Sequence, residues 1–223
     1  MTKHIVKISA IEHITHDTLR IETEKPANYT FEPGQATDIA INKNGWQDEK
    51  RPFTFTSLPD DKHLEFIIKT YPSHDGTTDK LLDTHVGDEL ILHDVFGSIR
   101  YKGEGVFIAG GSGVTPFVAM LRYLKQQGST DQNLMIFANK TRSDIILKKE
   151  LEELLDGKLI NILSEEKTEE HANGTITEAF LKDHINHFSQ LFYICGPLPM
   201  MEAVEKQLDN LGVSADQIIK EGW

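Results

Sequence analysis

A glycine-rich segment in the second half of the chain has the composition of a phosphate-binding turn. Residues 110–116, GGSGVTP, follow an apolar run and precede a helical pattern. Glycines at such a junction let a ligand approach the backbone, and the N–H groups at the start of the helix attract a pyrophosphate. Thr115 suits the N-cap and Pro116 the first helical position. A tight turn without a ligand is the alternative, but three glycines within four residues favour binding, although the spacing is not G-x-G-x-x-G.

A second segment occupies the equivalent place after another apolar strand pattern. Residues 195–200, CGPLPM, follow LFYI. In open α/β sheets, ligands bind at the carboxyl ends of the strands, so both segments are expected at one binding edge. Considered alone, Cys195 is better explained as a buried structural cysteine.

Two segments in the first half combine groups that suit a flavin nucleotide. Residues 51–57, RPFTFTS, supply a guanidinium for a phosphate, an aromatic ring for the flavin and hydroxyls for its N5. An ordinary aromatic strand with a surface arginine explains this segment equally well. Residues 76–81, GTTDKL, are expected to form a loop that leads into a short helix. A threonine N-cap there would leave N–H groups for a second phosphate.

The elements that position these segments change in character near residue 100. Before it, period-two alternation separated by turn residues predicts short strands and a closed antiparallel barrel or sandwich. The expected strands are 4–14, 18–23, 36–42, 63–71 and 88–94, with 51–57 as a further strand.

After residue 100, continuous apolar runs alternate with helical patterns. This βαβα repetition predicts a parallel sheet with helices on both faces, and the domains are expected at 1–101 and 102–223. Expected strands are 106–111, 134–139, 158–164 and 191–196, and expected helices are 116–128, 143–155, 177–185 and 200–212.

Composition excludes several classes of protein. The net charge of −12 argues against nucleic acid or an anionic membrane as partner. No apolar run approaches the roughly 20 residues of a membrane helix, and the N-terminus lacks a signal-peptide pattern, so a cytoplasmic location is expected. A single cysteine excludes an internal disulfide and any all-cysteine metal or iron–sulfur site. His184 and His187, spaced i,i+3 on an expected helix, are better explained as solvated than as metal ligands, and no metal is expected.

The order of the motifs resembles the ferredoxin–NADP reductase family over essentially the whole chain. RPFTFTS, GTTDKLL, GDEL, FGSI, GGSGVTPF, CGPLPM and a closing EGW follow one another as in that family. The resemblance implies a FAD-binding β-barrel followed by an NAD(P)-binding α/β domain. It also implies an oxidoreductase that takes a hydride from NADH or NADPH into FAD and passes electrons to a separate acceptor, such as a flavodoxin or ferredoxin.

The family's site residues fall on specific positions. The flavin positions implied by the resemblance are Arg51, Pro52, Phe53, Thr54, Lys69, Thr70, Tyr71, Gly76, Thr77, Thr78 and Trp223. The implied dinucleotide positions are Gly110, Gly111, Gly113, Thr115, Pro116, Ser164, Glu165, Cys195, Gly196, Pro197 and Met200. The implied catalytic residues are Thr54 at flavin N5, Cys195 beside the nicotinamide C4, Glu221 near the nicotinamide, and Trp223 stacked on the flavin.

Two departures from the family's pattern carry expectations. The plant-like members close with Glu-x-Tyr, whereas this chain closes with Glu221-Gly222-Trp223, and a larger ring predicts slower displacement by nicotinamide. NADP-using members carry Ser-Arg where this chain has Ser164-Glu165-Glu166. A carboxylate there repels a 2′-phosphate and accepts a bond from a 2′-hydroxyl, so NADH is favoured. A free-flavin reductase and a non-catalytic nucleotide-binding accessory subunit remain the alternative functions.

Overall fold

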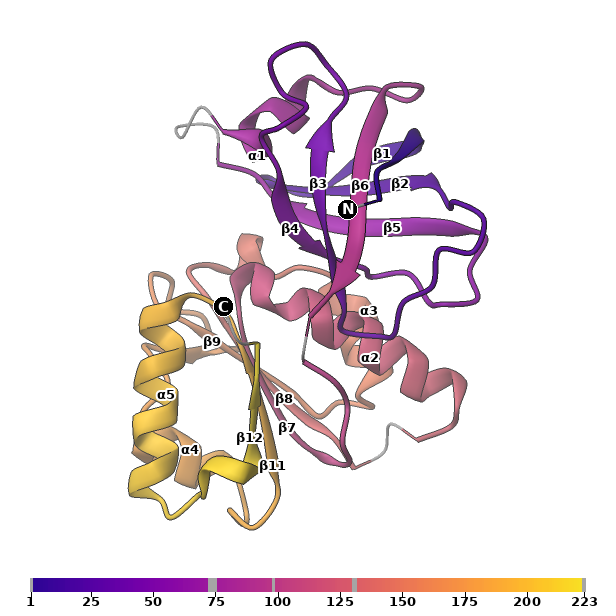
Figure 1. Cartoon of the computed structure of the whole chain (residues 1–223). Coiled ribbons are helices and arrows are strands. Elements are labelled where there is room, and N and C mark those ends of the chain that lie inside the picture. Colours follow the sequence, from indigo (N-terminus) through magenta and orange to yellow (C-terminus); the bar gives the residue numbers. More distant parts are fainter. Residues whose placement is uncertain (1, 72–75, 98, 130–131, 222–223) are drawn as a thin grey trace. The chain divides into compact units, whose positions relative to one another are not determined.

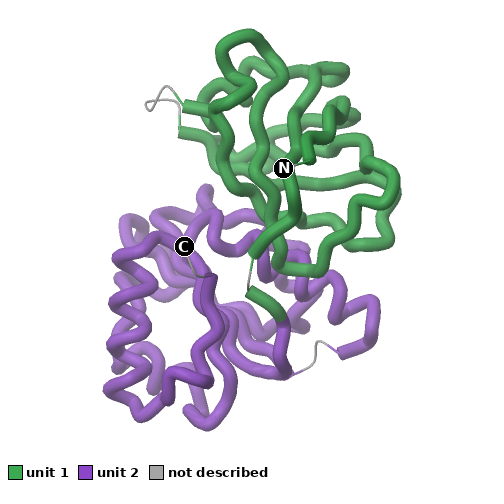
Figure 2. The backbone as a smooth tube through the Cα atoms, in the orientation of Figure 1, with its two compact units in different colours: residues 1–100 green, residues 101–223 purple. Residues whose placement is uncertain are grey.

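The chain forms two compact units in the computed structural model, which describes residues 2–71, 76–97, 99–129 and 132–221. The first unit is Met1–Arg100 and the second is Tyr101–Trp223 (Figure 2). Each unit has its own sheet and its own hydrophobic core.

The first unit is built on a six-stranded antiparallel sheet of order β4-β3-β6-β1-β2-β5 (Figure 1). Its elements are β1 (His4–Thr15), β2 (Thr18–Glu24), β3 (Ala36–Ile41), β4 (Arg51–Thr54), β5 (His63–Lys69), α1 (Thr77–Lys80) and β6 (Glu89–Phe96). Beyond β4, Phe55 forms a bridge with Phe66 of β5, and the Thr56 N–H donates to the Glu65 carbonyl at 2.9 Å. These contacts join the two edge strands and close the sheet into a barrel.

Aromatic side chains fill the barrel. Phe55 is fully buried and stacks on Phe31 with ring centroids 4.2 Å apart, while Tyr29 meets the same ring edge-on. The Tyr29 hydroxyl donates to the His93 carbonyl at 2.7 Å, which satisfies the one polar group that the ring brings inside. Burial raises the pKa of Tyr29 to about 12, so this hydroxyl keeps its proton.

The second unit is built on a six-stranded parallel sheet of order β10-β9-β8-β7-β11-β12. Its strands are β7 (Gly105–Gly110), β8 (Leu134–Asn139), β9 (Leu159–Leu163), β10 (Ala172–Asn173), β11 (Leu191–Cys195) and β12 (Ile218–Lys220). Its helices are α2 (Thr115–Gln126), α3 (Lys148–Leu154), α4 (Glu178–His184) and α5 (Leu198–Asn210). The expected antiparallel barrel followed by a parallel α/β sheet is confirmed.

Helices cover both faces of this parallel sheet (Figure 1). Ile108 of β7 packs in one cluster with Val204 and Leu208 of α5. The next residue back, Phe107, points to the other face, where its ring lies 5.0 Å from that of Phe117 in α2. Burial on both faces explains why β7 is a continuous apolar run rather than an alternating one.

The expected helix 143–155 is wrong in its first half. Thr141 and Asp144 form a capping box around a 3-10 turn, Arg142–Asp144. Ile145 is then extended, and Leu147 adopts a left-handed conformation (φ 53°) before α3 begins at Lys148. The capping box starts the 3-10 turn, which ends at the extended Ile145, and the β-branched pair Ile145 and Ile146 is buried instead of continuing a helix.

Smaller differences occur at other positions. The short strands β10 and β12 have no counterpart among the expected strands, because two or three residues carry too little periodicity to detect. Helix α4 ends at His184, so His187 lies outside it. Among the described residues, none of the helices combines the length and the apolar character that a membrane crossing requires.

Candidate functional site

The glycine-rich turn and the Cys-Gly-Pro segment meet at the carboxyl edge of the parallel sheet. They follow the neighbouring strands β7 and β11, in which Ala109 is the partner of Cys195. A Cβ on Gly113 would lie 2.3 Å from the Cys195 carbonyl oxygen, and a Cβ on Gly110 would lie 2.5 Å from the Met200 sulfur. Glycine is therefore required at Gly113, where the two segments pack backbone against backbone, while Gly110 leaves room for the side chains of Met200 and Pro197.

The glycine-rich turn differs from expectation in its capping. Gly111 has φ +51° and opens a 3-10 turn, Gly111–Val114, that continues directly into α2. Thr115 is the first helical residue rather than the N-cap, because its hydroxyl donates to the Ser112 carbonyl at 3.0 Å. The first N–H groups of the 3-10 turn have no partner within it, so it keeps the anion-binding character that a helix start provides.

Cys195 and Glu221 are buried close to this turn. Their exposed fractions are 8% and 7%. Burial raises the pKa of Cys195 to about 12, with a further contribution from the charge of Glu221, and burial also raises the pKa of Glu221. The Glu221 Oε1 atom has no hydrogen-bond partner among the described residues. A buried carboxylate oxygen without a partner fits a site that a polar ligand completes.

Gly222 and Trp223 lie outside the described residues, and the expected stacking of Trp223 on a flavin remains a prediction.

The turn after β9 carries the two carboxylates from which NADH preference is expected. The Glu165 carboxylate lies 3.2 Å from the Lys140 ammonium group, and the Glu166 carboxylate lies 3.1 Å from the Arg142 guanidinium. Sequence reasoning missed both cations, which follow the predicted strand 134–139. Because the ends of neighbouring parallel strands share an edge, their position after that strand was the available signal.

In the first unit, β4 is an edge strand that carries the expected flavin signature. The exposed Arg51 donates from its guanidinium to the Lys50 carbonyl at 2.8 Å. Phe53 packs partly against the barrel core, while Pro52 and Thr54 are half-buried. An exposed guanidinium and a half-buried hydroxyl on one strand fit a flavin nucleotide, although the core contact already covers part of the Phe53 ring.

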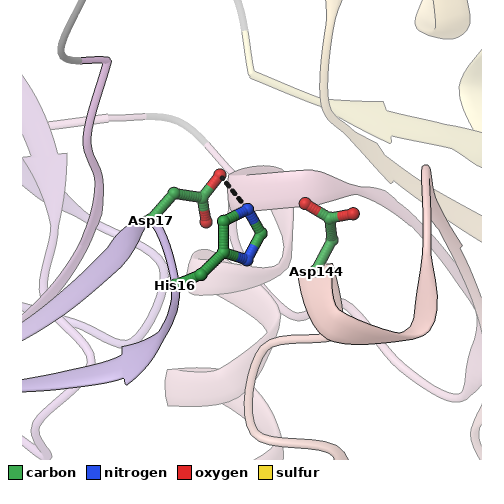
Figure 3. Close-up of side chains that lie close together, drawn as sticks. All are labelled: His16, Asp17 and Asp144. Atoms are coloured by element: carbon green, nitrogen blue, oxygen red, sulfur yellow. Dashed lines mark ion pairs between the residues drawn. The ribbon is translucent and has the colours of Figure 1, made fainter.

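The segment after β5 is fastened to the turn between β1 and β2. The Lys69 ammonium group lies 2.6 Å from the Asp17 carboxylate, and the Thr70 hydroxyl donates to the Asp17 carbonyl at 2.9 Å. His16 Nε2 lies 3.6 Å from the same carboxylate (Figure 3). Burial acts to raise the pKa of Asp17, but the hydrogen bonds and charge of Lys69 and Thr15 outweigh it and lower the pKa. Tyr71, 41% exposed, is the large exposed side chain of this segment.

Asp144, also drawn in Figure 3, belongs to the second unit. There its carboxylate accepts a hydrogen bond from the Thr141 hydroxyl at 2.6 Å, within the capping box described above.

The expected second phosphate loop is present with a different cap. Gly76 precedes α1 in an extended conformation, and Thr77 is buried with its hydroxyl donating to the Glu49 carbonyl at 2.8 Å. The expectation of a threonine N-cap is therefore wrong, because this hydroxyl donates to a distant carbonyl instead of accepting from its own helix. Thr78 is half-buried beside it.

Comparisons with known proteins identify both units. Residues 3–91 match the family model described as "FAD-binding domain", and residues 107–206 match "Oxidoreductase NAD-binding domain". The chain is 32% identical over 232 residues to the reductase component of propane 2-monooxygenase from Rhodococcus jostii. This alignment covers 95% of this chain and 61% of the relative. The chain thus spans about three fifths of that relative's length.

Two further comparisons agree with this. The ferredoxin–NAD(P)+ reductase component of the naphthalene 1,2-dioxygenase system from Pseudomonas putida is 25% identical, over 97% of this chain and 67% of the relative. The crystal structure of a ferredoxin NADP+ reductase from Neisseria gonorrhoeae with bound FAD and NADP has a TM-score of 0.86 at 19% identity. It covers 99% of this chain and 98% of that one, which shows the shared fold. With its FAD-binding and NAD-binding domains in this order, the chain belongs to the ferredoxin–NADP reductase-like family.

Proposed function

We propose that this protein is an NAD(P)H-dependent flavoprotein reductase that passes electrons to a separate acceptor. The observation that carries the proposal is the packing of the glycine-rich turn against Cys195, together with the buried Glu221, whose Oε1 atom has no hydrogen-bond partner in the described part of the chain. The glycine-rich turn and Cys195 suit a dinucleotide that crosses the carboxyl edge of the sheet at β7 and β11. Glu221 would supply a carboxylate near the nicotinamide end of that dinucleotide.

The flavin would be held by the first unit. Arg51 and the α1 loop, Gly76–Thr78, offer a cation and backbone N–H groups for the two phosphates, which favours FAD over FMN. Thr54 and Tyr71 offer a hydroxyl and an exposed ring for the flavin itself. FAD held by these residues would supply the redox chemistry that the side chains lack, namely a hydride acceptor and a one-electron donor.

The dinucleotide-binding residues would orient the hydride donor. Cys195 stays neutral because of its raised pKa, so it provides a compact, uncharged wall rather than a nucleophile. Glu221 would accept a hydrogen bond through Oε1 and fix the orientation of the reacting ring. Trp223 would cover the flavin until the nicotinamide arrives.

The acceptor is proposed from the nature of the relatives. Two of them are reductase components of oxygenase systems, so we propose an oxygenase component or a ferredoxin as the acceptor. The net charge of −12 makes a strongly acidic partner less favourable than a neutral or basic one.

Steady-state assays test this proposal. Purified protein should oxidise NADH with ferricyanide as an artificial acceptor, and flavin released by denaturation should be FAD. A colourless protein that rapidly reduces added FMN or riboflavin would make it a free-flavin reductase. A yellow protein that oxidises neither NADH nor NADPH would make it an accessory subunit.

A further inference from the structure

The turn Ser164–Glu166 stands on the carboxyl edge at a distance that suits the adenosine end of a dinucleotide. Strand β9 lies two strands from β7, so the turn is roughly 10 Å along the edge from the glycine-rich turn. A dinucleotide with its pyrophosphate on the glycine-rich turn and its nicotinamide toward Cys195 must send its adenosine in the opposite direction, across β8 and β9.

The main chain fastens this turn to the end of β8. The N–H groups of Ser164 and Glu165 donate to the carbonyls of Asn139 and Lys140 at 3.0 and 2.9 Å. The Asn139 side chain is only 8% exposed, yet neither its Nδ2 nor its Oδ1 atom has a hydrogen-bond partner among the described residues. A buried amide with both groups unsatisfied is an independent sign that a polar ligand belongs at this edge.

Asn173 fastens the same turn from the other side. Its side-chain amide donates to the carbonyls of Leu163 and Glu166, both at 3.1 Å. The Gly174 N–H adds a bond to the Leu163 carbonyl at 2.8 Å. One amide group thus joins the last residue of β9 to the last residue of the turn, which it can do because it has two donor hydrogens.

The held turn presents charge in a defined arrangement. Glu166 accepts from the Arg142 main-chain N–H at 2.8 Å as well as pairing with its guanidinium, and Glu165 pairs with Lys140. Each carboxylate therefore forms an ion pair with a cation that could otherwise attract a phosphate. A fixed turn keeps both cations occupied, whereas a loosened turn releases them.

We propose that Asn173 is a positioning residue that sets the discrimination between NADH and NADPH by holding this turn. The inference rests on the proposed function, because it concerns the dinucleotide of that reaction. With the turn fixed, Glu165 faces the adenosine ribose as an acceptor for a free 2′-hydroxyl. With the turn loosened, Lys140 and Arg142 become available to a 2′-phosphate.

The test uses Asn173→Leu, which keeps the approximate size of the side chain and removes its two donor hydrogens without adding a charge. We expect the ratio of kcat/KM for NADH to that for NADPH to fall about 5- to 10-fold, through KM, while kcat changes less than about 2-fold. Asn210→Leu is the matched control, since Asn210 is the last residue of α5, at the end away from the carboxyl edge, and its amide donates at 2.7 Å to Glu178, the first residue of α4. An unchanged ratio, or a change carried by kcat alone, overturns the inference.

A second variant and a second readout separate the outcomes. If Asn173→Leu does not fold, Glu166→Gln decides. It weakens the ion pair with Arg142, so its ratio of kcat/KM for NADH to that for NADPH must also fall. Calorimetry with 5′-AMP and 2′,5′-ADP measures the preference without turnover. Wild type that binds 5′-AMP better, with the preference reversed or lost in the variant, supports the inference even if no dinucleotide is oxidised. The absence of dinucleotide oxidation would contradict only the proposed function, not the role of Asn173. Equal fragment preferences in wild type and variant overturn the inference.

Discussion

Two buried residues at the carboxyl edge, Cys195 and Glu221, have raised pKa values. Cys195 is the only cysteine of the chain, and its pKa is raised to about 12, first by burial and then by the charge of Glu221. An unperturbed thiol has a pKa of about 8.5. The two values are far enough apart for a direct titration.

The thiol of Cys195 should resist ionisation in the folded protein. A raised pKa means that the protonated form persists as the pH rises, so at pH 10 folded protein should show almost no thiolate absorbance at 240 nm. Denatured protein should show the full signal at that pH. Glu221→Gln should move the folded titration to lower pH, because it removes a negative charge. A folded thiol that titrates near pH 8.5 would contradict the burial argument.

Glu221 should affect the reaction more than binding. Glu221→Gln removes the acceptor charge but not the side-chain volume, so the rate of flavin reduction in stopped-flow should fall about 10- to 100-fold, with a smaller change in Kd for NADH. Glu202→Gln, on the exposed face of α5, is the control. An unchanged reduction rate would remove Glu221 from the reaction.

At the scale of elements, the close packing of the turns after β7 and β11 shapes the candidate dinucleotide site. Turns after β7 and β11 approach so closely that Gly113 has no room for a side chain, whereas a Cβ on Gly111 would meet nothing within 4 Å. These two glycines therefore serve different purposes within one turn.

The substitutions Gly113→Ala and Gly111→Ala should separate those purposes. Gly113→Ala forces the backbone at Cys195 to move and should lower the free energy of unfolding by about 2 to 4 kcal/mol, with loss of NADH binding. Gly111→Ala should cost about 1 kcal/mol, from the left-handed backbone alone. Urea unfolding measures both. Equal costs would show that the contact with Cys195 does not constrain the turn.

Much of the element order could be predicted, because period-two alternation and continuous apolar runs report burial directly. The two motifs at the carboxyl edge were predictable for the same reason. The caps at Thr77 and Thr115 were not, because each hydroxyl donates to a carbonyl instead of capping its own helix. The grip of Asn173 on a turn several residues earlier likewise depends on strand pairing that periodicity does not report.

At the scale of the whole molecule, each of the two units would contribute one cofactor site to the proposed reaction. The barrel unit matches a FAD-binding family model and the parallel-sheet unit an NAD-binding one. Neither unit alone can complete the proposed hydride transfer, so the activity belongs to the intact chain.

The whole protein should also distinguish NADH from NADPH in turnover. NADH should exceed NADPH in kcat/KM by about 5-fold or more at low ionic strength, because Glu165 and Glu166 occupy the nearby cations. Added salt should narrow the gap, since it screens exposed charges. Equal values for the two dinucleotides, or a preference for NADPH, would remove the charge argument.

An anaerobic absorbance titration of purified protein tests the proposed transfer most directly. The protein should be isolated yellow, with a flavin band near 450 nm from bound FAD. Stoichiometric NADH should bleach that band in the absence of oxygen, and ferricyanide should restore it. A flavin band that persists in excess NADH and NADPH would contradict the proposed hydride transfer.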